Sequence, residues 1–458
     1  MSAGLAVLLL LVTVVGGQAR ADVTPTFADA GGIHVVAITQ IDTRQLDVAV
    51  VPSALGRAVH VRILVPSDYA STGERLPVLY LFHGTSGRAS DWVTSGAAEE
   101  ATAGLPLIVV MPDAGFDGDG GGWFTDWVNT TTALGPSAWE TFHVGQLIPW
   151  VDANLRTRAS RDGRAIAGLS QGGFGSMSYA ARHPDLFVSA ASFSGAPDID
   201  YDPVAAVGAT AIVEGTAFGL DGVDPEAMFG SRATNEINWQ GHDPADLVTN
   251  LRNVDLWLYT ATGAPGPYDD PANPNLGAMG IEALTHASTL SFVQHANDVG
   301  VPVHVDDYTL GTHTWPYWSR DLQQYLVPMM QTFASPPPAP SAISYESADA
   351  QWSHWGWSVA LQRAAAQQLS QLSDAGPGGF VLQGTGTATV TTPASYAPGA
   401  IADVTISSAL GQSTTMAVAD DTGRLHLVVP LGLDVAVPAV VGIPVIVGAP
   451  TTVTISIV

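Results

Sequence analysis

The chain has 458 residues, a formal net charge of −26 at pH 7 and no cysteine. This length exceeds that of one compact domain, and the lack of cysteine excludes disulfides and thiolate metal sites. The strongly acidic balance excludes nucleic acid and anionic lipid surfaces as partners, because both require clustered cations.

Residues 1–21 have the pattern of a signal peptide. An apolar core from Leu5 to Val15 precedes Ala19-Arg20-Ala21, which has the small-x-small form of a signal-peptidase site. We therefore expect a mature chain from Asp22 and a secreted protein, located outside the cell or in the cell wall. No later run reaches about 18 uninterrupted apolar residues, so we expect no membrane span.

From Leu46 to about Phe333, short apolar runs alternate with segments of helical character. Near-continuous apolar strands separated by helices indicate a mostly parallel sheet that is covered on both faces. The predicted fold class is therefore α/β, with the element order of an α/β hydrolase. The expected strands are 59–65, 77–82, 107–111, 164–169, 187–193, 254–260 and 301–309.

A proline-rich stretch at residues 335–341 is interpreted as a linker, because the amino-acid composition changes after it. It separates a catalytic domain over residues 22–334 from a small all-β, sandwich-like accessory domain over residues 342–458. Period-two runs support that second domain, at 384–392, 401–407, 424–429 and 451–458. Three of its tryptophans, Trp352, Trp355 and Trp357, fit buried strand aromatics better than the alternative, a sugar-binding platform.

The segment Gly168-Leu169-Ser170-Gln171-Gly172 follows an apolar strand and opens a helix. A Gly-x-Ser-x-Gly sequence in that context predicts a nucleophile elbow, a strained turn that exposes the serine hydroxyl above the sheet. Its glycines are needed because a Cβ there would collide with neighbouring elements. We therefore assign Ser170 as the candidate nucleophile of a serine hydrolase or acyltransferase, rather than part of an ordinary turn.

A serine hydroxyl needs a base, and the base needs an acid that orients it. His313 is the favoured base because it follows the last predicted strand of the first domain. Asp269, Asp270 and Glu282 compete as the acid, and position alone favours the two aspartates slightly. The residues themselves leave this choice open.

Three segments together resemble the antigen 85 mycolyltransferase and esterase family: 168–175, 139–142 with 148–151, and 311–318. The likeness covers roughly residues 46–333, and Gly-Thr-His-x-Trp-x-Tyr-Trp is its most specific motif. It implies that Glu282, which we place at the start of a helix over residues 281–297, is the acid. For the oxyanion hole, the elbow itself indicates the N–H of Gln171, and the resemblance indicates Thr85.

Candidate substrate-binding residues are His83 and Arg88 in the loop after the strand 77–82, Asp126 and Trp127, and Trp315 in the histidine motif. The resemblance implies that Trp123, Asp126 and Trp127 line the substrate cleft; packing at the surface is the alternative. The aspartates of residues 113–122 are spaced somewhat as in a calcium-binding loop. The bidentate glutamate that such a loop needs at its far end is missing, so no metal or cofactor is expected.

The loop 83–88 departs from the mycolyltransferases and resembles that of secreted feruloyl and carbohydrate esterases. We expect a secreted serine esterase or acyltransferase that acts on carboxylic esters through an acyl-enzyme on Ser170. The alternatives are a mycolyltransferase with an acceptor such as trehalose, and a non-catalytic cell-wall or matrix-binding protein. The expected partner is an ester, of a lipid or of a cell-wall carbohydrate.

Overall fold

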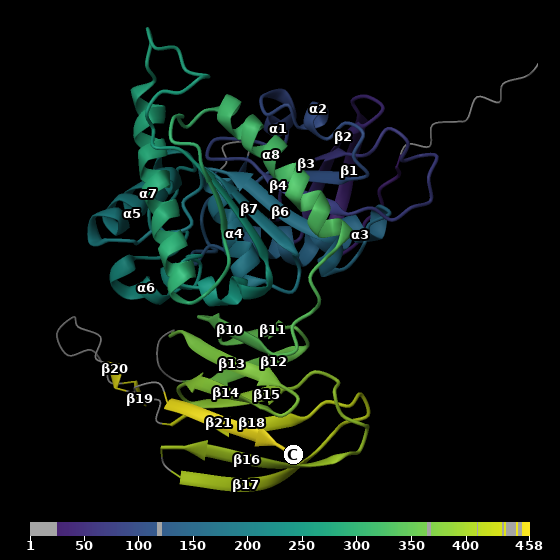
Figure 1. Cartoon of the computed structure of the whole chain (residues 1–458), viewed down its shortest axis with the longest axis vertical. Helices are drawn as coiled ribbons and strands as arrows, with labels where there is room; N and C mark the ends of the chain where they lie inside the picture. The colour runs from purple at the N-terminus through teal and green to yellow at the C-terminus, as the bar shows by residue number, and fades with distance from the viewer. Residues whose placement is uncertain are drawn as a thin grey trace, which may run out of the picture.

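The computed structural model of the chain describes residues 25–116, 121–363, 368–409, 411–432, 435–436, 446–447 and 451–458. It has two parts, a sheet covered by helices and a β-rich part that follows it (Figure 1). The expected signal peptide, residues 1–21, lies outside the described residues.

A nine-stranded sheet forms the centre of the first part. Its strands are β1 (Ile33–Gln40), β2 (Gln45–Pro52), β3 (Val59–Leu64), β4 (Val78–Phe82), β5 (Ile108–Pro112), β6 (Arg164–Leu169), β7 (Ser189–Phe193), β8 (Asp255–Thr260) and β9 (His304–Asp307). They lie in the order β1-β2-β3-β5-β4-β6-β7-β8-β9. All pairs from β5 to β9 are parallel, and β1, β2 and β3 extend one edge by antiparallel pairing. The predicted mostly parallel sheet is confirmed.

Both faces of the central strands β4, β5, β6 and β7 are buried, which explains why these strands are largely apolar without alternation. In β4, Val78, Tyr80 and Phe82 belong to one hydrophobic cluster, whereas Leu79 and Leu81 belong to another on the opposite face. Successive side chains of a strand point to opposite faces, so each face needs its own apolar layer.

Helices supply those two layers (Figure 1). Trp92 of α1, Ala98 of α2 and Leu322 of α8 pack in the cluster of Leu79, whereas Phe174 of α4 and Phe292 of α7 pack in the other. The helices are α1 (Asp91–Thr94), α2 (Ala98–Ala101), α3 (Ile148–Asn154), α4 (Gln171–Arg182), α5 (Pro203–Gly219), α6 (Arg232–Gln240), α7 (Leu276–Asp298) and α8 (Trp315–Ala334), with a π-helix η2 (Thr141–Leu147) before α3 and 3₁₀ turns η3 (Arg161–Gly163) and η4 (Val248–Asn253).

The β-rich part contains two larger antiparallel sheets, ordered β10-β13-β14-β21-β16-β17 and β11-β12-β15-β18, and a short pair β19-β20. The strands are β10 (Ile343–Ser347), β11 (Gln351–His354), β12 (Trp357–Gln362), β13 (Ser370–Gly376), β14 (Gly379–Gly384), β15 (Thr387–Thr391), β16 (Ile401–Ser408), β17 (Gly411–Val418), β18 (His426–Pro430), β19 (Val435–Ala436), β20 (Ile446–Val447) and β21 (Thr451–Ile457). Alternate residues of both larger sheets form one core, for example Leu382 with Val390. The all-β, sandwich-like prediction is confirmed.

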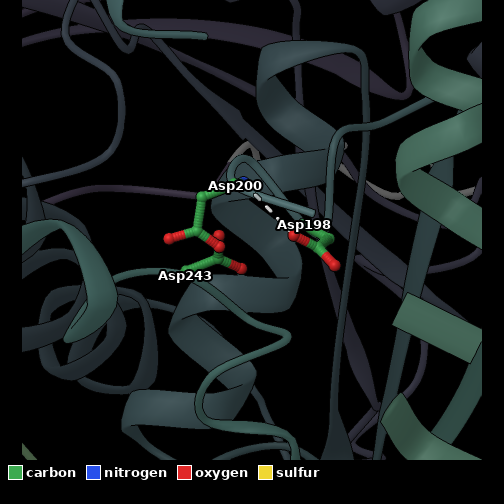
Figure 2. Close-up of side chains that lie close together, drawn as sticks. All are labelled: Asp198, Asp200 and Asp243. Carbon is green, nitrogen blue, oxygen red and sulfur yellow. Dashed lines mark hydrogen bonds between the residues drawn. The ribbon is translucent and has the colours of Figure 1, made fainter. Parts of the chain in front are cut away.

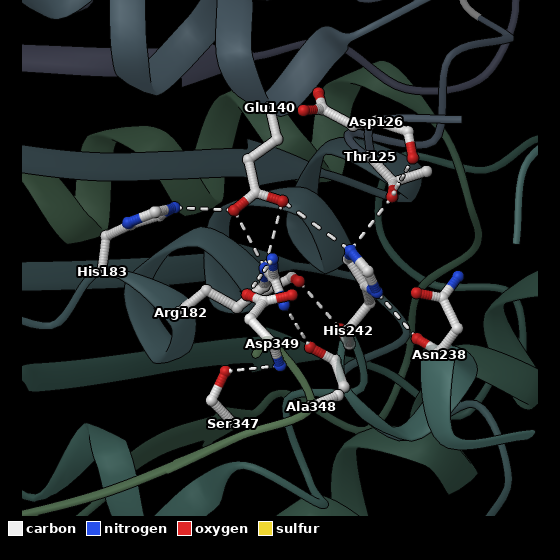
Figure 3. A network of polar contacts seen from close by, with 12 residues as sticks. Thr125, Asp126, Glu140, Arg182, His183, Asn238, His242, Ser347, Ala348 and Asp349 are labelled. Carbon is white, nitrogen blue, oxygen red and sulfur yellow. Dashed lines mark hydrogen bonds and ion pairs between the residues drawn. The ribbon is translucent and has the colours of Figure 1, made fainter. Parts of the chain in front are cut away.

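A buried polar network joins the two parts (Figure 3). Arg182, at the end of α4, donates from Nε to both carboxylate oxygens of Glu140 (2.9 and 3.0 Å) and from Nη2 to Asp349 (3.0 Å). The hydroxyl of Tyr345 donates to the Arg182 carbonyl at 2.8 Å. A buried guanidinium is costly to leave unpaired, so these contacts fix the β-rich part against α4.

We propose that residues 22–334 fold without the β-rich part, because the sheet and both of its helical layers lie before Ser335. A chain of residues 22–334 should hydrolyse soluble esters, but its melting temperature should fall by several degrees because Arg182 loses Asp349 and buried surface becomes exposed. Differential scanning calorimetry and p-nitrophenyl acetate hydrolysis measure the two effects. In the full chain, Asp349→Asn should cause a smaller fall; a well-folded but inactive truncation would contradict the proposal.

Candidate active site

Ser170 occupies the turn between β6 and α4 with φ 52° and ψ −122°. A positive φ is unusual for a residue with a side chain and marks a strained backbone. A Cβ added to Gly168 would lie 2.3 Å from the carbonyl oxygen of Gly172, and one added to Gly172 would lie 2.4 Å from that of His83. The flanking glycines are therefore required by contact, as the sequence pattern predicts.

Three side chains from separate loops and helices meet at this turn. His313, which lies between β9 and α8, places Nε2 2.8 Å from the Ser170 hydroxyl and Nδ1 2.9 Å from the Glu282 carboxylate. Glu282 is fully buried and also accepts from the Ser194 hydroxyl (2.9 Å) and the Ala261 N–H (3.0 Å). This chain of contacts has the geometry of a serine, base and acid triad.

The helix that carries Glu282 begins earlier than the sequence predicts. It begins at Leu276, where the Asn275 side chain accepts from the Ala278 N–H, rather than at residue 281. Glu282 therefore lies in the second turn of α7, where it is held by the helix on one side and by Ser194 on the other.

Asp269 and Asp270, the competing acids, do not contact His313 in the described structure. Asp269 accepts from the hydroxyls of Thr312 (2.5 Å) and Tyr317 (2.6 Å), residues on either side of His313. Burial opposes ionisation of Asp269, but these bonds and one from the Gly266 N–H outweigh it and lower its pKa. Asp269 thus anchors the loop that carries the histidine.

A cavity of about 610 Å³ opens beside Ser170 and His313. Its lining is largely apolar, with side chains that come from elements far apart in the sequence: Trp123, Leu169, Ile212, Ile281, Trp315 and Trp318. Thr85 and Gln171 line the same cavity. A concave apolar site with a few convergent polar groups is the usual form of a small-molecule site.

The Esterase family model matches residues 52–329, which is more than half of the chain. The chain belongs to the Esterase family. Esterase Rv1288 of Mycobacterium tuberculosis is 33% identical over 290 residues, a match that covers 63% of this chain and 59% of that protein. The chain therefore spans about three fifths of the length of that relative. The diacylglycerol acyltransferase/mycolyltransferase Ag85A of Mycobacterium gordonae is 32% identical over 310 residues, covering 65% of this chain and 84% of that protein.

Solved structures with a similar fold include MPT51 of Mycobacterium tuberculosis, with a TM-score of 0.49, 28% identity and coverage of 62% of this chain and 97% of that one. A ferulic acid esterase matches with a TM-score of 0.44 and 22% identity over 66% of this chain and 98% of that chain. The resemblance to antigen 85-like esterases is confirmed at the level of the Esterase family.

The two expected oxyanion residues line the same cavity as Ser170. Gln171 is the first residue of α4, where backbone N–H groups have no acceptor within the helix and the helix dipole favours negative charge. Thr85 comes from the loop after β4 and reaches the same cavity. This placement agrees with a pair of N–H donors around a developing oxyanion.

The candidate substrate-binding residues divide into two groups. Trp315 lines the cavity, whereas His83, Arg88, Asp126 and Trp127 are not part of its described lining. His83 is buried and its Nε2 accepts from the Ala114 N–H at 2.9 Å, so it supports the loop rather than the cavity.

The other three residues of that group lie elsewhere for clear physical reasons. Arg88 is exposed and lines a separate polar cavity with Asp47 and Arg62. Asp126 accepts from the Thr141 hydroxyl and N–H, and Trp127 is buried with its indole N–H on the Gly122 carbonyl. Trp123 lines the cavity instead of Trp127.

Sequence reasoning missed Ser194, Ile212, Ile281 and Trp318 as parts of the site. Ser194 has φ 47° and holds Glu282, but nothing in the sequence after β7 marks it. Ile212 and Ile281 are exposed or half-buried residues of α5 and α7 whose position depends on how those helices pack.

One group of described residues could hold a metal ion: Asp198, Asp200 and Asp243, with carboxylate oxygens within 4.8 Å of one another (Figure 2). Burial, and then repulsion by neighbouring carboxylates, raises the pKa of Asp243. Arg232 approaches Asp200 at 3.6 Å. In the calcium-like segment 113–122, residues 117–120 lie outside the described residues, and Asp113 accepts from the N–H groups of His60 and Ala89.

Glu282→Gln should reduce kcat by about 10³- to 10⁴-fold, because an amide cannot stabilise the imidazolium of His313 or hold its tautomer. Asp269→Asn should reduce kcat roughly 10-fold, since it loosens Thr312 and Tyr317 and misplaces the base. The exposed Asp270→Asn is the matched control and should leave kcat unchanged. Steady-state hydrolysis of p-nitrophenyl butyrate compares them; a larger loss for Asp269→Asn would contradict the assignment of Glu282.

Asp246 provides a test of pH-dependent stability beside the acidic cluster. Burial, followed by repulsion from Asp200 and Asp198, raises its pKa to about 7. Between about pH 4 and pH 7 the unfolded chain releases this proton and the folded chain keeps it, so stability falls as pH rises. Urea unfolding should show Asp246→Asn more stable than the wild type by roughly 3 kcal/mol at pH 8. At pH 4, near the unfolded pKa, the two should be nearly equal; a constant difference at both pH values would refute this origin.

Proposed function

We propose that this protein is an exported serine carboxylesterase that works through an acyl-enzyme on Ser170. The observation that carries the proposal is the unbroken contact chain from Ser170 through His313 to Glu282 at the mouth of an apolar cavity. Membership of the Esterase family supports the reaction class.

In the first step, His313 Nε2 removes the proton from the Ser170 hydroxyl as the oxygen attacks the ester carbonyl. Negative charge develops on the carbonyl oxygen, where the N–H groups of Thr85 and Gln171 would stabilise it. The alkoxy group leaves with the proton from His313, and the acyl group stays on Ser170. Glu282 keeps the imidazole oriented and stabilises its charged form throughout.

In the second step, water occupies the place of the departed alcohol. His313 removes a proton from it as it attacks the acyl-enzyme, and then returns the proton to Ser170 when the carboxylic acid leaves. Atoms and charge balance over the two steps, and the water is the only added reactant.

The lining of the cavity supports esters with an apolar acyl group. Ile212 and Ile281 extend the apolar surface from Ser170 to the surfaces of α5 and α7, where both are about half exposed (50% and 48%). Burial of apolar surface contributes about 25 cal/mol per Å², so lengthening a short alkyl chain should strengthen binding until the cavity is full.

The export part of the proposal rests on the leader pattern of residues 1–21. In the described part of the chain, no helix combines the length and apolar composition that crossing a bilayer requires.

Ser170→Ala should abolish ester turnover and labelling by a fluorophosphonate probe without loss of stability, because the hydroxyl contributes no packing in the core. The wild-type enzyme should release p-nitrophenol in a burst followed by steady turnover, which reports an acyl-enzyme. Continued labelling of Ser170→Ala would overturn the nucleophile assignment. A wild-type chain that neither labels nor turns over would favour the non-catalytic alternative.

Hydrolysis should dominate over transfer to sugar. A transferase must position its acceptor well enough to compete with water at about 55 M, and neither Arg88 nor Asp126 belongs to the described lining of the cavity. Millimolar trehalose should therefore change total turnover less than twofold. Mass spectrometry of the products from a short-chain donor measures the partition; mainly acylated trehalose would establish the mycolyltransferase alternative.

A further inference from the structure

A second cavity, of about 220 Å³, lies in the β-rich part where it meets the proline-rich segment. Three separate turns and the linker contribute to it, and the residues that carry its chemistry are Pro340, Ser341, Trp355, Ser395 and Tyr396. None of its described lining residues carries a charge. The cavity is distinct from the site at Ser170, with which it shares no lining residue.

Trp355 lines this cavity with its backbone in an unfavourable conformation. It is the first residue of a two-residue turn, Trp355-Gly356, that joins β11 and β12, and its φ is 54° while that of Gly356 is 82°. Such a turn favours asparagine followed by glycine, and a left-handed conformation costs a bulky residue about 1 kcal/mol or more. A tryptophan kept at a position that disfavours it indicates that its ring has a role.

The ring is held in place by the first part of the molecule. The guanidinium of Arg161 lies over the ring at 5.3 Å, and the carboxylate of Asp185 accepts from the backbone N–H of Trp355 at 3.0 Å. The same carboxylate lies 2.9 Å from Nδ1 of His354. A ring fixed before the ligand arrives loses little entropy on binding, which raises affinity.

We propose that this cavity binds one neutral pyranose unit of a polysaccharide. The C–H faces of a sugar ring pack on aromatic rings such as those of Trp355 and Tyr396, and its hydroxyls suit the exposed hydroxyls of Ser341 and Ser395. The cavity is smaller than the roughly 300–1,000 Å³ of typical ligand pockets, so it admits a single ring. An extended proline-rich peptide fits less well, because the linker's own Pro340 already occupies one wall.

Binding at this place would hold the enzyme on an insoluble polysaccharide while Ser170 acts on esters nearby. Trp355 takes no part in the contact chain of Ser170, so hydrolysis of a soluble ester should not depend on it. Polysaccharide binding and the proposed esterase activity can therefore be tested independently of each other.

The substitution Trp355→Asn tests the role of the ring, because it removes the ring and places the favoured Asn-Gly pair in the turn. We expect the wild-type chain to be retained on at least one of insoluble cellulose, xylan, mannan and β-1,3-glucan in a sedimentation assay. Trp355→Asn should lower that retention at least 10-fold, with an unchanged or higher melting temperature and unchanged hydrolysis of p-nitrophenyl butyrate. The control is Phe218→Asn, which removes an aromatic ring that is 69% exposed on α5, and it should retain wild-type binding.

Absence of wild-type retention on all four polysaccharides would overturn the proposal. So would equal retention of the wild type and Trp355→Asn. A lower melting temperature of Trp355→Asn would show that the ring serves to join the two parts through Arg161, and it would also count against the proposal. Retention on a polyproline resin alone would assign the cavity to proline-rich peptides instead.

Discussion

The close packing of β6 against α4 is the constraint on which the site depends. Gly168 and Gly172 touch backbone atoms so closely that no side chain fits at either position, and Ser170 is forced to a positive φ between them. This turn fixes the hydroxyl at the carboxyl edge of the sheet, where the loops after β4 and β9 and the helix α7 also arrive. The positions of the proposed oxyanion donors, base and acid therefore depend on one local packing arrangement and on the order of the strands.

Much of this arrangement could be predicted from the sequence, because it depends on local pattern. Strand β4 is apolar throughout, since both of its faces are buried, and such a run is visible in any sequence. The elbow has its own pattern of glycines. Strand β1, by contrast, is not among the expected strands; it lies at the edge of the sheet and most of its residues are exposed.

Other features could not be predicted because they depend on tertiary contacts. The choice between Asp269 and Glu282 rested on family resemblance, and the structure gives Asp269 a different task, that of holding Thr312 and Tyr317. The lining of the cavity by Ile212 depends on the packing of α5, about forty residues after the elbow in the chain. Asp126 and Trp127 follow Trp123 closely in sequence, yet only Trp123 is part of the described lining, since Asp126 binds Thr141 and Trp127 binds Gly122.

The pair formed by Arg182 and Asp349 has a consequence for the order in which the chain can fold. The two residues are 167 positions apart, so during synthesis α4 is complete long before Asp349 is added to the chain. Glu140, only 42 positions earlier, neutralises the guanidinium in that interval. The chain can thus assemble from its N-terminus without exposing an uncompensated charge in its interior, and the last strands then join a surface that is already formed.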